Sequence, residues 1–292
     1  MSAPLLAVDA PSLLYRAFFA LPQSITDGEG RPVNALLGTA NLVLFAVERY
    51  APRAVVLCWG AEAAAYRKQL YDPYHADRPP MPGELASQWE DAPAFFNAFG
   101  WASISETELE ADDLLGSLAH VEEAAGGEAL LFTGDRDMFQ CASEAVTVLF
   151  PRGGKDGPEE IGPDGVRERY GIEPAQRDEV RYLRGDPSDG LPGAKGIGAK
   201  TARDLLRTHG TLEGVIAAAR RPGTMTARLA GALTTDPDAL AAFQDIATLR
   251  AVTLARPADA ALHTAGAAHA AADREMNRLA ERLAKLGGAS TP

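Results

Sequence analysis

The sequence predicts an α/β fold: a mostly parallel, twisted sheet flanked by helices, followed by a helical C-terminal region. Two observations support this prediction. Short apolar runs alternate with segments whose apolar residues recur at helical spacing, which is typical of a parallel sheet covered on both faces. Beyond about residue 158, helical segments broken by glycine and proline replace that alternation.

The expected strands are short runs dominated by Ala, Val, Leu and Phe, each bounded by polar residues. They are residues 5–8, 54–59, 101–105, 129–132 and 145–150. Helices are expected at residues 34–50 and 110–124, where apolar residues repeat every three or four positions. Because sheets of this kind bind ligands at the carboxyl ends of their strands, functional residues are expected there.

Three parts are expected along the chain. Residues 1–175 form the α/β domain, and residues 176–256 form the helical region. The alanine-rich residues 257–292 form a C-terminal helix with a frayed tail.

Composition excludes several classes of protein. A chain that is 46% apolar and 23% charged is typical of a soluble globular protein. No basic leader precedes Asp9, and no run approaches the roughly 20 apolar residues of a membrane span. We therefore expect a cytoplasmic monomer without a membrane partner. Cys58 and Cys141 lack metal-ligand spacing and predict neither a disulfide nor a zinc site.

Carboxylates gather at the predicted strand ends. Asp9 directly follows the first strand, and Asp135 and Asp137 come just after residues 129–132. Further acidic residues lie in the first turn of helix 110–124 and in the turn "GDPSDG": Glu110, Asp112, Asp113, Asp186 and Asp189. Taken singly, these groups have structural explanations, because acidic residues favour helix N-termini and turns.

Taken together, the eight carboxylates predict a metal centre. At one edge of a sheet they would repel one another strongly unless cations were bound. Oxygen-only ligands favour hard divalent ions such as Mg²⁺ or Mn²⁺. Two such ions roughly 4 Å apart can activate a water and stabilise the leaving oxygen in phosphodiester hydrolysis.

Four segments carry a family resemblance. They are residues 8–22, 108–119, 133–140 and 185–202. In this order they resemble the bacterial 5′–3′ exonuclease and flap endonuclease family, which includes the N-terminal nuclease domain of DNA polymerase I. The resemblance runs from about residue 5 to about residue 255, and without a polymerase portion the chain is expected to be a stand-alone member.

The resemblance implies a PIN/Rossmann-like sheet and a structure-specific nuclease acting in DNA replication and repair. Its substrate would be DNA with a 5′ flap or 5′ end at a junction of single strand and duplex. Catalysis is expected to involve Asp9, Asp135, Asp137 and Arg16, the last of which corresponds to a family arginine near the scissile phosphate. The structural alternative for Arg16 is a surface arginine on an otherwise apolar helix.

The resemblance also assigns metal ligands. The first ion is expected on Asp9, Glu110 and Asp112. The second is expected on Asp135, Asp137 and Asp189, with Asp113 and Asp186 supporting through water or at longer range.

Residues 66–82, within an arch expected near residues 61–90, resemble the family segment through which the single-stranded 5′ end passes. Here tyrosines alternate with cationic residues, and stacking faces beside cations suit single-strand binding. The DNA contacts expected from it are Arg67, Lys68, Tyr74, His75 and Arg78. Without the family context, such a loop could equally be a surface cover.

The stretch "LPGAKGIGAKTARDLL" is neither a Walker loop nor a dinucleotide fingerprint, because the required glycines are missing. It predicts two helices joined by a glycine turn, whose free backbone N–H groups can hold phosphates. Family members grip duplex DNA with this helix-three-turn-helix, commonly with bound K⁺. The expected DNA contacts are Lys195, Gly196, Gly198, Lys200 and Thr201.

Charge is the main objection to a DNA partner, because the chain carries a net charge of −12. Residues 177–207 nevertheless hold seven basic residues against five acidic ones. If Asp186 and Asp189 bind metal, this segment offers a basic surface on an acidic protein. DNA binding is then expected to be modest and steeply dependent on salt.

Two departures from the family pattern keep alternatives open. Gly60 stands where the family has an aspartate, and His75 replaces a lysine with a group that is largely neutral at cytoplasmic pH. The favoured interpretation is an active nuclease, for which Gly60→Asp should raise cleavage. The alternatives are a weakened paralogue that binds flapped or branched DNA, and a PIN-like ribonuclease.

Overall fold

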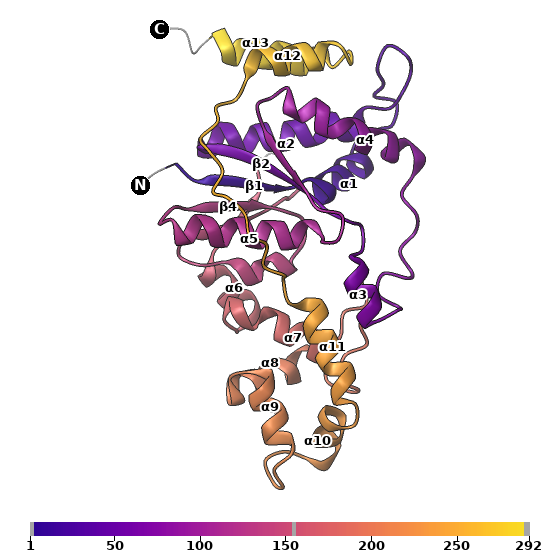
Figure 1. Ribbon diagram of the computed structural model, residues 1–292, viewed down its shortest axis with the longest axis vertical. Helices are drawn as coiled ribbons and strands as arrows, with labels where there is room; N and C mark the ends of the chain where they lie inside the picture. Colours follow the sequence, from indigo (N-terminus) through magenta and orange to yellow (C-terminus); the bar gives the residue numbers. More distant parts are fainter. Residues whose placement is uncertain (1–2, 154–155, 289–292) are drawn as a thin grey trace.

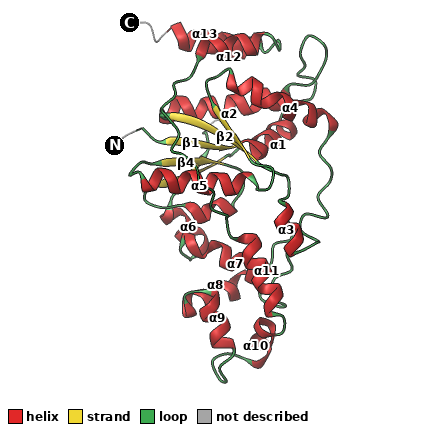
Figure 2. Cartoon of the chain, viewed as in Figure 1, coloured by secondary structure: helices red, strands yellow, loops and turns green. Residues whose placement is uncertain are grey.

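The computed structural model describes residues 3–153 and 156–288. A six-stranded sheet lies at the centre of its upper part (Figures 1 and 2). The strands are β1 (Leu5–Asp9), β2 (Ala54–Trp59), β3 (Ala102–Ser105), β4 (Ala129–Phe132), β5 (Val146–Phe150) and β6 (Glu159–Ile161). Their order is β3-β2-β1-β4-β5-β6, and the first five pair in parallel, which confirms the predicted α/β fold.

Strand β6 was not predicted. It pairs antiparallel with β5 at the edge of the sheet. Only three residues long, it contains one buried apolar side chain, that of Ile161. So short a segment cannot display the alternation by which a strand is found in sequence.

Five helices contribute to the apolar core on one side of the sheet. They are α1 (Ala10–Ala20), α2 (Asn34–Tyr50), α4 (Gly83–Asn97), α12 (Thr264–Ala272) and α13 (Asn277–Gly288). Leu6, Val8 and Leu57 of the central strands contribute to this core, as do Leu279 and Leu283 of α13. The C-terminal helices thus extend this core on its outer side, where they lie beyond α2 and α4 (Figure 1).

The opposite face packs against α5 (Ala111–Ala124), α6 (Pro163–Tyr170) and the short 3₁₀ helix η1 (Asp137–Cys141). Leu5, Ala7 and Val56 point into this second core. Strands buried on both faces read as continuous apolar runs, which is why β1, β2 and β4 were recognisable in sequence.

Below the sheet, after the 3₁₀ helix η2 (Pro174–Gln176), five helices form a separate core. They are α7 (Arg177–Arg184), α8 (Ala199–His209), α9 (Leu212–Ala219), α10 (Ala227–Thr234) and α11 (Pro237–Ala247). The short helix α3 (Ala65–Leu70) descends from the sheet and contacts this region, with the Tyr71 ring packed edge-on against Phe243 (Figure 1).

An extended segment returns the chain from α11 to the sheet. Between residues 249 and 263 it has neither helix nor strand. It is tied down by backbone hydrogen bonds, including Val252 N to Ser117 Oγ (2.9 Å) and His263 N to Phe99 O (2.8 Å). The expected single C-terminal helix is therefore an extended segment followed by two helices that begin at Thr264. Residues 289–292 of the expected frayed tail lie outside the described residues.

None of the helices in the described part of the chain combines the length and apolar character needed to cross a membrane.

Candidate metal centre

Asp9 anchors the centre at the end of β1. It is the N-cap of α1, where its Oδ1 accepts a hydrogen bond from Ser12 N (3.0 Å). Its Oδ2 accepts one from Thr133 Oγ1 (2.6 Å), and Thr133 Oγ1 in turn accepts one from Asp135 N (2.9 Å). Since β1 and β4 are adjacent parallel strands, the chain after β4 brings Asp135 beside Asp9.

Asp9, Asp112 and Asp135 form the first carboxylate group. Burial, opposed by the bonds from Thr133 and Ser12 and reinforced by Asp135, raises the pKa of Asp9 to about 6. Burial, together with the charges of Asp135 and Asp9, raises the pKa of Asp112 well above its usual value. No arginine, lysine or histidine pairs with these three carboxylates among the residues described. The group therefore holds excess negative charge.

Glu110 adjoins this group but is engaged by the protein. It caps α5, and its Oε1 accepts a hydrogen bond from Ala64 N (2.8 Å). The Tyr74 hydroxyl lies 3.2 Å from Oε2, and Arg67 forms an ion pair with the same oxygen.

Asp113 is fully buried and serves the structure around Glu110. It completes the capping box by accepting from Glu110 N (3.1 Å), and it also accepts from Arg67 Nη2 (3.1 Å) and Arg250 N (2.8 Å). With both oxygens so occupied, its supporting role toward a metal stays a prediction.

Asp137, Asp186 and Asp189 form the second carboxylate group. One oxygen from each lies within 4.8 Å of the other two. Burial and the nearby charge of Asp135 outweigh Arg181 and raise the pKa of Asp137 to about 6. Although burial opposes it, hydrogen bonds from Ser188 and the charge of Arg181 lower the pKa of Asp186.

Backbone geometry explains why "GDPSDG" presents two carboxylates. Asp186 N donates to Leu191 O (2.7 Å) and Leu191 N donates to Asp186 O (2.8 Å), which closes a tight loop. Gly193 has a φ of 64°, and a Cβ there would lie 2.1 Å from Gly185 N. A side chain at Gly193 would force this loop apart.

Arg181 of α7 is the cation of the second group. Its Nη1 lies 3.0 Å from Asp137 Oδ2, its Nε lies 3.0 Å from Asp186 Oδ2, and its Nη2 contacts Asp189 Oδ2. Sequence reasoning counted Arg181 only as part of a basic surface. The missed signal was its spacing from Arg177, since residues four apart share a helix face.

Arg177 and Asp178, at the start of α7, are also buried beside the second group. Arg177 stacks on the Tyr170 ring at 4.3 Å, and its Nη2 is 3.9 Å from Asp137 Oδ1. Burial raises the pKa of Asp178 well above its usual value, and its Oδ1 has no hydrogen-bond partner among the described residues.

Residues of the expected arch reach both carboxylate groups. Tyr74 is buried against Glu110, whereas His75 Nε2 and Arg78 Nη2 lie 2.8 and 3.0 Å from Asp189 Oδ1. Burial and nearby Arg78 lower the pKa of His75 to about 4. The positions of Arg67 and Tyr74 leave neither side chain open to DNA in this conformation, whereas Lys68 is exposed.

Arg16 lies seven residues beyond Asp9 on α1, about 10 Å along the helix axis. It lines a cavity of about 600 Å³ between α1, α2 and residues 151–153 and 157–158. Its expected role near the scissile phosphate stays a prediction.

The helix-three-turn-helix residues lie on the surface. Lys195, Gly196, Gly198 and Lys200 are exposed, and Thr201 is half-buried. No side chain caps the N-terminus of α8. Because Arg177 and Arg181 are buried, the basic surface of residues 177–207 is smaller than the sequence suggested.

Gly60 is held tightly between β2 and the start of α5. A Cβ there would lie 2.4 Å from Ala111 N and 2.5 Å from the Glu110 carbonyl carbon. The residue that the family pattern leads one to expect has no space in this backbone arrangement. This crowding argues against our sequence-based expectation that Gly60→Asp raises cleavage, and that expectation stays a prediction for the cleavage assay to decide.

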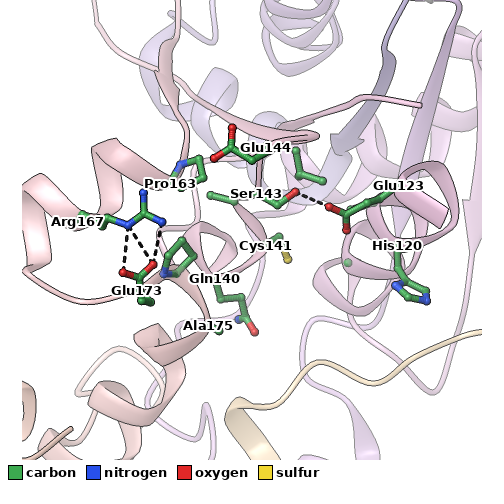
Figure 3. Close-up of a pocket in the computed structure, with 15 residues that line it drawn as sticks. His120, Glu123, Gln140, Cys141, Ser143, Glu144, Pro163, Arg167, Glu173 and Ala175 are labelled. Atoms are coloured by element: carbon green, nitrogen blue, oxygen red, sulfur yellow. Dashed lines mark hydrogen bonds and ion pairs between the residues drawn. The ribbon is translucent and has the colours of Figure 1, made fainter. Parts of the chain in front are cut away.

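A cavity of about 500 Å³ lies away from the carboxylates, between α5, η1 and α6 (Figure 3). Cys141 lines it, and its rim carries a hydrogen bond between Ser143 and Glu123 (2.7 Å) and an ion pair between Arg167 and Glu173. It contains none of the predicted metal ligands.

The donor set fits hard divalent cations. Both carboxylate groups offer only oxygen atoms, as Mg²⁺ and Mn²⁺ prefer. Burial, and after it the neighbouring carboxylates, raises the pKa values of Asp9 and Asp112, and no cation in the described residues pairs with either side chain.

Solved structures share the fold. The phage T5 D15 protein, crystallised with metal ions, matches with a TM-score of 0.70 and 15% identity, over 97% of this chain and 98% of that one. The catalytic core of Rad2 in complex with DNA substrate matches with a TM-score of 0.63 and 12% identity, over 97% of this chain and 91% of that one.

Curated relatives are DNA polymerases I. That of Thermus thermophilus is 39% identical over 211 residues, 72% of this chain and 25% of the relative. That of Mycobacterium tuberculosis is 37% identical over 213 residues, which are 73% of this chain and 24% of the relative. The chain therefore spans about a quarter of the length of these relatives.

Family models account for most of the chain. The N-terminal resolvase-like domain of 5′-3′ exonucleases matches residues 4–171, and their C-terminal SAM fold matches residues 172–270. Together with the carboxylate edge, these matches show that the chain belongs to the 5′-3′ exonuclease family.

Proposed function

We propose that this chain is a divalent-metal-dependent 5′–3′ exonuclease and flap endonuclease that hydrolyses DNA phosphodiesters at 5′ flaps and 5′ ends. One observation carries the proposal: two adjoining groups of buried and half-buried carboxylates, with Asp135 of the first group accepting a hydrogen bond from Asp137 N of the second (2.8 Å). Asp135 raises the pKa of Asp112 in the first group and of Asp137 in the second. Such proximity suits a pair of ions that act on one phosphate.

Each group would hold one ion. The first would use Asp9, Glu110, Asp112 and Asp135, and the second would use Asp137, Asp186 and Asp189. When bound, divalent ions supply Lewis-acid activation of water and stabilise the leaving oxygen. The chain itself orients the ligands: Thr133 fixes Asp9 through a 2.6 Å hydrogen bond, and the loop closed by Asp186 and Leu191 fixes the second set.

The helical region would bind the duplex. The N-terminus of α8 offers backbone N–H groups without a side-chain cap, flanked by exposed Lys195 and Lys200. K⁺ at this turn remains part of the proposal. Lys68 and Arg78, which are exposed near the carboxylates, would meet the single-stranded 5′ end.

Gly60 and His75 favour a second candidate, a weakened paralogue that binds flapped DNA but cuts it slowly. Gly60 removes a carboxylate that the family pattern places near the first group. His75 replaces a permanent cation with a ring whose pKa is lowered to about 4.

A flap-cleavage assay tests the proposal. The protein is incubated with 5′-flap DNA and Mg²⁺ or Mn²⁺, alongside Asp135→Asn and the control Asp164→Asn, whose carboxylate is fully exposed on α6. Metal-dependent cleavage should fall more than about 100-fold in Asp135→Asn, since even indirect metal partners contribute 10–100-fold. The control should cleave normally.

The assay also separates the two candidates. Cleavage that survives chelation, or persists in Asp135→Asn, would refute the metal mechanism. Flap binding without cleavage in the wild type would favour the weakened paralogue.

A further inference from the structure

Arg181 contacts all three carboxylates of the second group at once. Its three side-chain nitrogens face Oδ2 of Asp137, Asp186 and Asp189, with two of the contacts at 3.0 Å. Only 8% of its side chain is exposed, so water screens these contacts little. A guanidinium offers five N–H donors in a fixed plane and cannot lose its charge in a protein.

The first carboxylate group lacks such a cation. Arg67 pairs with Glu110 and Asp113 at the edge of that group. Asp9, Asp112 and Asp135 have no ion pair with any residue in the described ranges, whereas Arg67 and Arg181 pair with other carboxylates. The two groups are therefore neutralised differently by the same fold.

A guanidinium and a hard dication compete for the same oxygen lone pairs. The three carboxylates that Arg181 contacts are those whose oxygens lie within 4.8 Å of one another. A cation binding there would share or displace the contacts of Arg181, and separating buried opposite charges has a large free-energy cost.

We propose that Arg181 is an intramolecular competitor that sets the affinity of the second carboxylate group for a divalent ion. The first group fills first, and the second fills only as the guanidinium withdraws from it. This inference rests on the proposed function, because it assumes that both groups bind metal. Arg181 is therefore a positioning residue, because its guanidinium acts on the bound ion only through the carboxylates that it contacts.

Arg177 provides a matched control. It lies on the same helix face, four residues earlier, and is similarly buried. However, it reaches only Asp137, at 3.9 Å, and stacks on Tyr170. Replacing it removes the same charge without freeing the three carboxylates.

Mn²⁺ binding, followed by calorimetry and by electron paramagnetic resonance of the free ion, tests the inference without reference to cleavage. Arg181→Met removes the charge while nearly keeping the volume. Its second Mn²⁺ should bind about tenfold or more tightly than in the wild type, which corresponds to about 1.4 kcal/mol. The affinity of Arg181→Lys for the second Mn²⁺ should lie between those of the wild type and Arg181→Met. The affinity of Arg177→Met should differ from that of the wild type by less than about threefold.

Metal-free Arg181→Met is expected to be less stable, because three buried carboxylates lose their cation. If Arg181→Met unfolds without metal, its melting temperature is measured as a function of Mn²⁺ concentration instead. The proposal then requires Mn²⁺ to raise the melting temperature of Arg181→Met more than that of the wild type. If the wild type binds two ions and Arg181→Met binds the second no more tightly, Arg181 is not a competitor. If neither protein binds Mn²⁺, the proposed function falls as well.

Discussion

The imidazole of His75 joins the arch segment to the second carboxylate group, with its Nε2 2.8 Å from Asp189 Oδ1 and its Nδ1 3.1 Å from the Glu62 carbonyl oxygen. His75 makes these contacts from a left-handed backbone conformation with a φ of 57°. It therefore holds the base of the arch against the loop that carries Asp189.

His75→Ala should loosen this connection. Loss of a hydrogen bond to a charged group is worth about 1.5–3 kcal/mol. Trypsin should cut faster at exposed Lys68 and Arg78, and denaturant melts should show the lower stability. The neighbouring control, Asp77→Asn, changes an exposed side chain and should leave both unchanged. Equal protease resistance in His75→Ala would show that other contacts hold the arch.

Gly60→Asp should lower the stability of the fold. A Cβ at this position would lie 2.4 Å from Ala111 N, so the start of α5, which carries Glu110 and Asp112, must move. Overpacking of this kind costs about 1–3 kcal/mol. Thermal melts should show a similar decrease in melting temperature for Gly60→Asp and Gly60→Ala, because both substitutions add a Cβ that contacts the backbone. Faster flap cleavage by Gly60→Asp at low Mn²⁺ would instead show that α5 yields and accepts a new ligand.

Glu122 should make stability depend on acidic pH. It is fully buried on α5 between Arg53 and Arg256, with contacts of 2.5 and 2.6 Å. Although burial opposes it, hydrogen bonds from these arginines lower the pKa of Glu122 below its ordinary 4.5. Its stabilising contribution is therefore complete above pH 4.5 and is lost as the pH falls through the lowered value.

Glu122→Gln should cost about 3 kcal/mol at neutral pH, because it leaves buried Arg53 without its main partner. Melting curves should show the gap from the wild type narrowing below about pH 4.5. The adjacent exposed control, Glu123→Gln, should show no such gap. A gap that is constant down to pH 3 would contradict the assigned pKa direction.

Lys200→Glu should weaken binding to flap and plain duplex DNA alike. The exposed lysine lies in the first turn of α8, where a duplex phosphate is expected. Losing one phosphate contact lowers the slope of log affinity against log salt by about 1. Fluorescence anisotropy across salt concentrations measures this, with Lys285→Glu on distant α13 as the charge-matched control. Equal weakening by both variants would indicate a general charge effect.

The sheet was predictable from sequence because its strands are buried on both faces and read as unbroken apolar runs. Strand β6 was not predictable, because three residues carry no periodicity. Helix α5 was expected to begin at residue 110, and its acidic first turn accounts for the close agreement: Glu110 and Asp113 form the capping box.

The candidate metal-binding residues were partly predictable. Acidic residues after β1 and β4 had to meet, since parallel neighbours end at the same edge. Their partners could not be predicted, because Arg181 and His75 reach the carboxylates from segments whose relative placement depends on tertiary packing. Gly60 shows the same limit. In the sequence a glycine at this position suggested a missing ligand, whereas in the structure the backbone at Gly60 lies against the backbone of Glu110 and Ala111.

The extended segment at residues 249–263 adds a covalent connection between the sheet and the helical region near residue 250, beside the one near residue 171 and the arch segment that carries α3. With several such connections, the helical region is not a domain that hangs on one linker. Cutting the chain at residue 250 would both release this connection and strip Leu279 and Leu283 from the upper core.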